Sequence, residues 1–200
     1  MNDRAVLFSI KPKYCELIAS GKKTVEVRKT RPKIPTPFKG YIYCTKPKMI
    51  TKYVFKPEDY PEYMRPEKTI FCKAPDASSP FCSPVNGNSK VIGEFVCDAI
   101  FPISIKYSNP ESRLALKEFP FTCLTDKQII DYLGNGKEGY ALHISNLVIY
   151  DKPKELSDFK KYNRTCYYSE LGFAIPKCSD CRDCNLKRPP QSWCYVEDKQ

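Results

Sequence analysis

The stretch that decides the fold runs from Gly21 to Arg28 and reads Gly-Lys-Lys-Thr-Val-Glu-Val-Arg. Its second half alternates apolar and polar side chains, which is typical of a β-strand with two different faces. Val25 and Val27 share one face, which we expect to enter a core. Glu26 and Arg28 share the other, so this polar face is either solvated or used for function.

The residues before this strand predict a strand and a short helix. Residues 5–10 read as a strand, and Pro12 suits the first turn of a helix. Apolar residues follow at helical spacing, and Gly21 is well placed to end the helix in a left-handed conformation. The predicted order is therefore strand, helix, strand within the first 28 residues.

Further strands and one helix are predicted downstream. Alternating side chains indicate strands over residues 40–45, 90–100 and 140–150, the last of them bent at Ser145-Asn146. A helix is expected over residues 126–133, because Thr125 and Gln128 have the spacing of a capping box. Five or six short strands with two helices predict a mostly β fold with α inserts, a small barrel.

The predicted organisation divides the chain in two. Residues 46–88 are rich in proline, serine, asparagine and glycine and are expected to be a long insertion with little regular structure. Residues 1–151 would form the barrel around this insertion. Residues 152–200 are polar and rich in cysteine, and we expect them to form an appendage that packs back on the barrel.

Positive charge is concentrated at one end of the chain. The formal net charge is +10, and the first 56 residues carry fourteen basic and three acidic side chains. The other 144 residues are almost balanced, with 19 basic and 20 acidic side chains. A charge excess confined to a patterned segment favours a polyanionic partner such as nucleic acid over a merely solubilising surface.

Composition excludes several classes of protein. The chain is 42% hydrophobic, which is enough for a core, so it is not globally disordered. No stretch approaches the roughly 18 apolar residues of a membrane span, and the start lacks the apolar run of a signal peptide. We therefore expect a cytoplasmic protein that has no membrane partner.

A cysteine cluster near the C-terminus predicts a metal site. The spacing Cys178-x2-Cys181-x2-Cys184 supplies three thiolates within seven residues, and a tetrahedral ion needs one more ligand from Cys166 or Cys194. An iron–sulfur cluster also uses such spacing. Structural zinc is favoured, because a loop-rich appendage with little apolar core needs a metal cross-link to stabilise its fold.

Taken together, these motifs resemble those of the ASCH domain, a PUA-like β-barrel. The opening of that family is matched by Ser9-Ile10-Lys11-Pro12, by the helix, and by Gly21-Lys22-Lys23 with Glu26-Val27-Arg28. Val91-Ile92-Gly93-Glu94-Phe95 and Gly139-Tyr140-Ala141-Leu142-His143-Ile144 are similar to its closing strands. Pro189-Pro190-Gln191-Ser192-Trp193-Cys194-Tyr195 resembles the tail of phage and bacterial members. The resemblance covers roughly residues 5–45, 89–151 and this tail.

The resemblance implies a cleft lined by the polar residues of the motif. Members without a cysteine cluster can carry a cysteine at Cys194, so Cys166 is preferred as the fourth metal ligand. A bound single-stranded nucleotide needs cations for phosphate, a plane for stacking and hydrogen-bonding groups for the base edge. RNA is expected in preference to DNA. The predicted nucleic-acid-binding residues are Ser9, Lys11, Lys23, Glu26, Arg28, Tyr43 and Lys46.

Two alternatives to binding remain open at this point. Some family members hydrolyse N4-acetylated cytidines with a lysine and a threonine; the lysine aligns with Lys23, but the threonine aligns with Glu26, which cannot form the same acyl intermediate. A hydrolase or ribonuclease would then use Lys23 as a base, with its pKa depressed by cationic neighbours, and Glu26 as its partner. The plainer alternative is a structural ion pair between Glu26 and Arg28.

Overall fold

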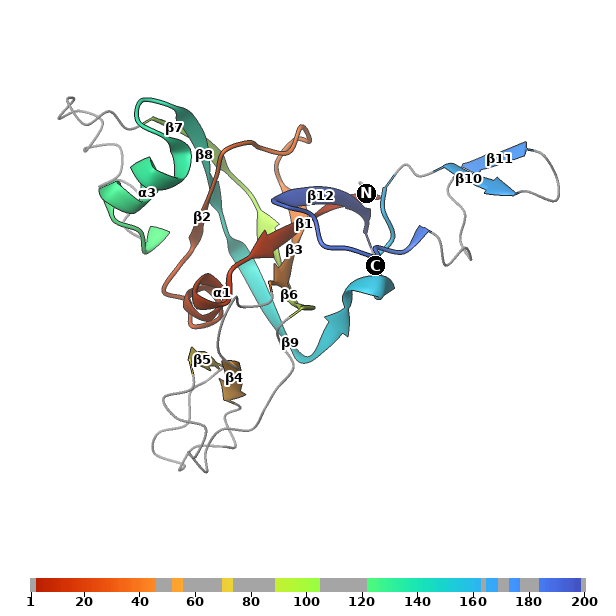
Figure 1. The fold of residues 1–200 in the computed structure, drawn as a ribbon, viewed down its shortest axis with the longest axis horizontal. Helices are drawn as coiled ribbons and strands as arrows, with labels where there is room; N and C mark the ends of the chain where they lie inside the picture. Colours follow the sequence, from red (N-terminus) through yellow and green to blue (C-terminus); the bar gives the residue numbers. More distant parts are fainter. Residues whose placement is uncertain are drawn as a thin grey trace.

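The structure is a computed structural model of residues 1–200. It describes residues 3–45, 89–104, 122–162 and 184–198 in full, and the backbone alone of residues 52–55, 70–73, 165–168 and 173–176. Figure 1 shows these parts coloured along the chain.

The described chain is mostly β-structure with two short α-helices, as the sequence predicts. Its elements are β1 (Arg4–Ile10), α1 (Pro12–Ala19), β2 (Val25–Arg28), β3 (Phe38–Cys44), β4 (Lys52–Phe55), β5 (Ile70–Lys73), β6 (Lys90–Cys97), β7 (Ile100–Ser104), α3 (Asp126–Leu133), β8 (Glu138–His143), β9 (Ser145–Glu155), a 3-10 helix (Leu156–Asp158), β10 (Thr165–Tyr168), β11 (Phe173–Pro176) and β12 (Trp193–Glu197).

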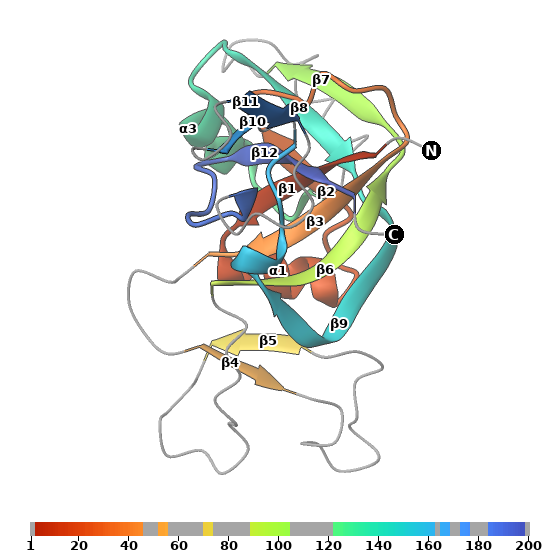
Figure 2. The ribbon, with the colours of Figure 1, turned by 90° about the vertical axis from the view of Figure 1, so that its right-hand side faces the viewer.

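Two sheets form the body of the fold. The larger has the order β12-β1-β3-β6-β9, and the smaller has the order β2-β8-β7. β1 and β3 run parallel, whereas the other pairs in these sheets are antiparallel. Figure 2 shows the strands of the larger sheet side by side, with β9 at one edge and α1 against one face. The two sheets are not closed into one hydrogen-bonded ring by the described strands, so the fold is an open variant of the barrel expected from sequence.

Three apolar clusters hold these layers together. The largest lies on one face of the five-stranded sheet, where α1 contributes Cys15 and Ile18 and β8 contributes Leu142. A second cluster covers the opposite face and includes Phe159. The third joins α3 to the outer face of the three-stranded sheet and includes Val25 and Val27, as their alternation predicted.

Local sequence signals explain where the helices begin and end. Pro12 occupies the first turn of α1, and Gly21 has a φ of +72°, which confirms the predicted left-handed position after that helix. Thr125 accepts a hydrogen bond from the backbone of Gln128, whose side chain accepts one from the backbone of Thr125. This is the predicted capping box. Asn146 has a φ of +47°, which places the predicted bend at the beginning of β9.

The C-terminal strand returns to the beginning of the chain. β12 pairs with β1 from Arg4↔Glu197 to Phe8↔Trp193, so a strand near residue 195 becomes one edge of the main sheet. This pairing brings residues 190–192 beside Ser9, because the amide of Ser9 donates to the carbonyl of Ser192 at 2.9 Å. The predicted division between residues 1–151 and 152–200 stays a prediction.

Within the described residues, neither α-helix is long or apolar enough to cross a bilayer, since α1 and α3 have eight residues each.

Candidate nucleic-acid interface

A cavity of about 860 Å³ opens where the end of β1, α1, β2, α3 and the C-terminal residues 190–192 meet. Among the described residues, its lining carries five basic and two acidic side chains, which gives it a positive net charge. The residues that line it are Ser9, Ile10, Lys11, Lys13, Tyr14, Lys23, Glu26, Val27, Arg28, Lys29, Thr30, Thr45, Leu124, Gln128, Asp131, Tyr132, Pro190, Gln191 and Ser192.

Three buried charged residues form what we call the charged floor of this cavity: Lys23, Glu26 and Arg28. Their exposed fractions are 2%, 8% and 5%. Glu26 lies between two cations, with Oε2 at 3.3 Å from Lys23 Nζ and Oε1 at 3.1 Å from Arg28 Nη2. The polar face of the predicted strand therefore lines the cavity with paired charges, because each oxygen of its carboxylate lies beside a cation.

The ammonium group of Lys23 has a partner for each of its N–H bonds. Nζ donates to the carbonyl of Val25 at 2.6 Å and to that of Thr122 at 2.7 Å, and its third neighbour is the carboxylate of Glu26. Three acceptors match the three donors of a protonated lysine, which has no lone pair. The contacts thus fit a structural ammonium ion better than the general base considered from sequence.

Arg28 fastens the C-terminal segment to the cavity. Its Nη2 donates to the carbonyl of Ser9 at 2.8 Å, and its Nη1 donates to the carbonyl of Ser192 at 3.2 Å. Ser9 Oγ in turn donates to the carbonyl of Pro190 at 2.6 Å. The bond between Ser9 and Pro190 links residues 181 positions apart. Since residues 190–192 line the cavity, it is complete only when they are docked.

Exposed lysines, the half-buried Tyr14 and the exposed Tyr132 form the walls above the charged floor. On α1, Lys13 Nζ lies 4.6 Å from the ring centre of Tyr14. Lys29 Nζ lies 5.3 Å from the ring centre of Tyr132, which belongs to α3 and is 39% exposed. Each wall therefore offers a cation next to an aromatic plane, the combination that single-stranded nucleic acid uses for phosphate and base.

The structure brings most of the predicted binding residues together. Ser9, Lys11, Lys23, Glu26 and Arg28 all line the cavity. Lys46 lies outside the described residues.

Tyr43 is placed elsewhere, which corrects its expected role as a stacking platform. Its side chain is 4% exposed and belongs to the apolar cluster around Phe159, on the opposite face of the sheet from α1. Burial raises the pKa of its hydroxyl above the usual value. The alternation along β3 is correct, but it gives no indication of which face borders the cavity, and Ile42 and Cys44 occupy that side.

Several lining residues were missed from sequence. Tyr14 lies in the helix predicted after Pro12, and Tyr132 lies in the helix predicted over residues 126–133, more than a hundred positions away. The sequence predicts both helices, but no local pattern indicates that the two helices flank one cavity. Ser192 belongs to the tail motif, and its role depends on the long-range pairing of β12 with β1.

His143 pairs with an aspartate outside the cavity. Its Nδ1 lies 2.7 Å from Asp98 Oδ1, and both side chains are about two-fifths exposed. Burial raises the pKa of Asp98, but hydrogen bonds with His143 and Ser145 outweigh it and lower the pKa overall. The histidine is thus paired with an acidic side chain and does not line the cavity.

The predicted metal site falls largely outside the described residues. This holds for Cys178, Cys181 and the side chain of Cys166. Cys184 is described and is 3% exposed, and Cys194 packs at the edge of the cluster around Phe159. In the described parts of the chain, no three His, Cys, Asp or Glu side chains are grouped as metal ligands.

Comparison with solved structures identifies the architecture. A crystal structure of a serine-to-alanine mutant of the ASCH protein from Zymomonas mobilis superposes with a TM-score of 0.51, covering 98% of this chain and 92% of that chain at 19% identity. The fold is of the ASCH type. The ASCH structure without this mutation from the same organism gives a TM-score of 0.48 at 19% identity, over 78% of this chain and 76% of that chain.

This ASCH-type fold confirms the resemblance in fold drawn from the sequence motifs. No protein-family model and no curated protein matches the sequence. At this level of identity the likeness concerns the fold alone, so the function has to be argued from the cavity.

Proposed function

We propose that the cavity binds single-stranded nucleic acid, with RNA preferred over DNA. The observation that carries the proposal is the pairing of an exposed lysine with a tyrosine ring on each wall of a positively charged cavity. Bases stack on such rings, and lysines neutralise the neighbouring phosphates. PUA-like folds are often linked to RNA binding, which agrees with this chemistry.

The size of the cavity favours unpaired bases. Ligand pockets commonly measure about 300–1,000 Å³, and a volume of about 860 Å³ can take one or two nucleotides rather than a duplex. Tyr14 and Tyr132 would each hold one base. Lys11, Lys13 and Lys29, all exposed, would hold phosphates. The RNA preference rests on polar groups at the rim, such as the Thr45 hydroxyl, which could bond a 2′-hydroxyl.

In this proposal the charged floor has a positioning role. Both oxygens of Glu26 already face cations, so the carboxylate shapes the cavity while keeping free lone pairs for a base amine. The hydrolase or ribonuclease considered from sequence would need Lys23 as a base, and three acceptors around its Nζ argue against that role.

We further propose that the C-terminal cysteines bind a structural zinc ion through Cys166, Cys178, Cys181 and Cys184. The support is the spacing of the thiolates in the sequence. The ion would staple the appendage and would have no part in nucleic-acid binding.

Fluorescence anisotropy tests the binding proposal with labelled single-stranded RNA, single-stranded DNA and duplex RNA of one sequence. We expect the affinity to be highest for single-stranded RNA, lower for single-stranded DNA and lowest for duplex RNA. If three lysines contact phosphates, log K should fall with log salt with a slope of about −2. Tyr14→Ala and Tyr132→Ala should each weaken binding by about 1–3 kcal/mol.

The matched control is Phe101→Ala, which removes an aromatic side chain that is 41% exposed on β7 and lies outside the cavity lining. It should leave affinity unchanged. Absence of binding at low salt, or equal losses in Phe101→Ala and the two tyrosine variants, would contradict the proposal. Incubation of the same RNA and of an N4-acetylcytidine with the protein checks for turnover, which would restore the enzymatic alternative.

A further inference from the structure

A row of exposed cations leads out of the cavity along the connection between β2 and β3. Lys29, Thr30, Arg31 and Lys33 are exposed, and from Arg31 to Ile34 the exposed cations alternate with the buried Pro32 and Ile34. The alternation means that the buried residues anchor the connection and the cations stand outward. We call Lys29, Arg31 and Lys33 the basic ladder.

Two cations of the ladder lie over tyrosine rings, and the backbone of the third residue contacts a tyrosine. Lys29 lies over the ring of Tyr132, as described above, and the guanidinium carbon of Arg31 lies 5.7 Å from the ring centre of Tyr140. The backbone amide of Lys33 donates to the hydroxyl of Tyr195 at 2.6 Å. The cation–tyrosine pairing of the cavity wall is thus repeated beyond the cavity.

The ladder is held in place by the C-terminal strand. The indole Nε1 of Trp193 donates to Thr30, at 3.3 Å from its carbonyl and 3.2 Å from its hydroxyl. Trp193 packs edge-on against Tyr195, with ring centres 5.3 Å apart. Since Thr30 also lines the cavity, the ladder begins at the cavity rim on an anchored segment. Because this connection is already ordered, binding a partner there would cost little conformational entropy.

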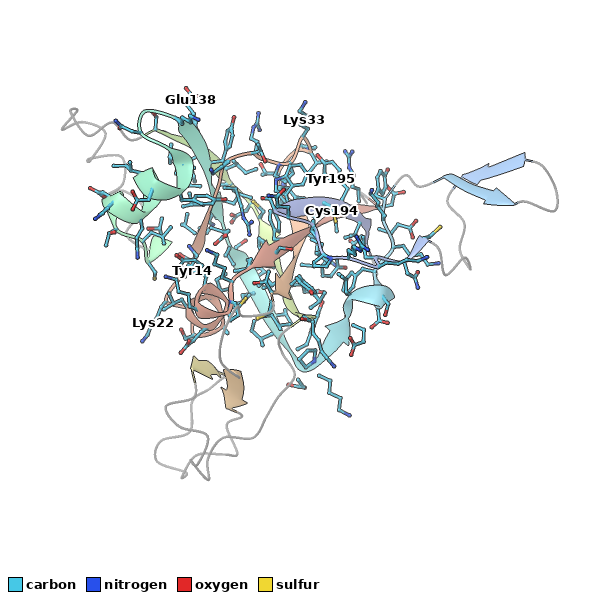
Figure 3. The ribbon with its side chains drawn as sticks, in the orientation of Figure 1. Tyr14, Lys22, Lys33, Glu138, Cys194 and Tyr195 are labelled. Carbon is cyan, nitrogen blue, oxygen red and sulfur yellow. The ribbon has the colours of Figure 1, made fainter. Side chains whose placement is uncertain are left out.

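The ladder and the cavity lie in one continuous direction. Figure 3 shows Tyr14 by α1 and Lys33 at the middle of the β2–β3 connection, next to Tyr195, with β2 between them. Successive ladder cations are two residues apart, so their Cα atoms are at most about 7 Å from one another. An extended strand with one phosphate per nucleotide can meet such a series of charges one after another.

We propose that the basic ladder is an exit path for the bound strand, in which Arg31 and Lys33 contact phosphates of nucleotides beyond those held in the cavity. The inference rests on the proposed nucleic-acid binding and adds the course of the strand: from Tyr14 across the charged floor to Tyr132, then over Thr30 to Lys33. Binding should therefore strengthen with oligonucleotide length until the ladder is filled.

The test compares a trinucleotide with an oligonucleotide of about twelve residues, long enough to fill a single-strand site. In the wild-type protein the longer RNA should bind more tightly and with a steeper salt dependence. Arg31→Gln/Lys33→Gln should reduce the salt slope for the longer RNA by about 1.4, which corresponds to a loss of roughly 20-fold at 0.1 M salt. Affinity for the trinucleotide should not change.

Two controls separate the ladder from general charge and from packing. Lys152→Gln/Lys154→Gln removes the same charge from β9, at the opposite edge of the sheet from β12, and should leave both affinities unchanged. Arg31→Lys/Lys33→Arg keeps the charge and should bind the longer RNA as the wild type does.

The outcomes distinguish this inference from the function on which it rests. If neither RNA binds the wild-type protein, the proposed function fails and the ladder fails with it. If both RNAs bind but with equal affinity, or if the ladder variant loses no more than the β9 variant, the exit path is wrong while binding in the cavity stands.

Discussion

Replacing Glu26 with glutamine would remove the negative charge that lies between Lys23 and Arg28. The shape of the side chain is kept, but the amide nitrogen now presents a donor to one of the two cations. Lys23 and Arg28 are 2% and 5% exposed, so water cannot replace the lost carboxylate. Two buried cations would then face each other without a counter-ion.

The magnitude follows from the contact distances. At separations of 3.3 and 3.1 Å and an effective dielectric constant of about 20, each ion pair contributes about 5 kcal/mol of Coulomb energy. Much of this offsets desolvation, and breaking a buried pair typically costs about 3–5 kcal/mol of unfolding free energy. For a chain of this length that loss lowers the melting temperature by roughly 10 °C.

Thermal and urea unfolding, followed by circular dichroism, would measure the loss. Lys90→Gln is the matched control, because it breaks an ion pair with Glu155 whose side chains are 26% and 57% exposed. That change should cost at most about 1 kcal/mol. A loss of under about 1 kcal/mol for Glu26→Gln would refute the view that the carboxylate joins two buried charges.

A double-mutant cycle would isolate the pair. Lys23→Met/Glu26→Gln should cost about 1–3 kcal/mol less than the sum of its two single variants, because the second change removes one of the stranded cations. Strict additivity would indicate that Lys23 is held by its two carbonyl acceptors alone.

The remaining predictions concern packing, alkaline pH and metal. Gly40→Ala would place a methyl group 2.5 Å from the ring of Phe95, so we expect a loss of about 1–3 kcal/mol in urea unfolding; an unchanged midpoint would contradict this. Burial raises the pKa of Cys97 from 9.0 to about 12. Its folded state retains the proton that the unfolded chain releases, so its contribution to stability is complete below pH 9 and declines towards pH 12; Cys97→Ala should flatten that decline. Purified protein should contain one zinc per chain by elemental analysis, lost in Cys181→Ser and kept in Cys194→Ser; loss of zinc in Cys194→Ser but not in Cys166→Ser would assign the fourth ligand to Cys194.

Short-range features of the fold could be predicted because they are encoded within a few residues. The capping box at Thr125 needs only a threonine and a glutamine three positions apart. The alternation from Val25 to Arg28 separates a core face from a polar face whatever lies around it. These signals depend on backbone hydrogen bonding and side-chain periodicity, which act locally.

Long-range features could not be predicted, because no local signal specifies which elements meet. The pairing of β12 with β1 determines the position of Ser192, and the approach of α1 to α3 determines that Tyr14 and Tyr132 flank one cavity. Tyr43 shows the same limit from the other side. The sequence predicts its strand and the alternation of side chains along it correctly. Which face of the sheet borders the cavity, however, depends on the whole fold.

The pairing of β1 with β12 also orders events during synthesis. The first strand of the sheet leaves the ribosome long before its partner, because the bond between Ser9 and Pro190 spans 181 positions. At translation rates of about 5–20 residues per second, the wait is roughly ten to forty seconds. Until then Arg28 lacks its contacts with Ser192, so a nascent or prematurely terminated chain would have the basic segment without the finished cavity. Only chains that have been translated past Ser192 could therefore form the complete cavity and bind its ligand.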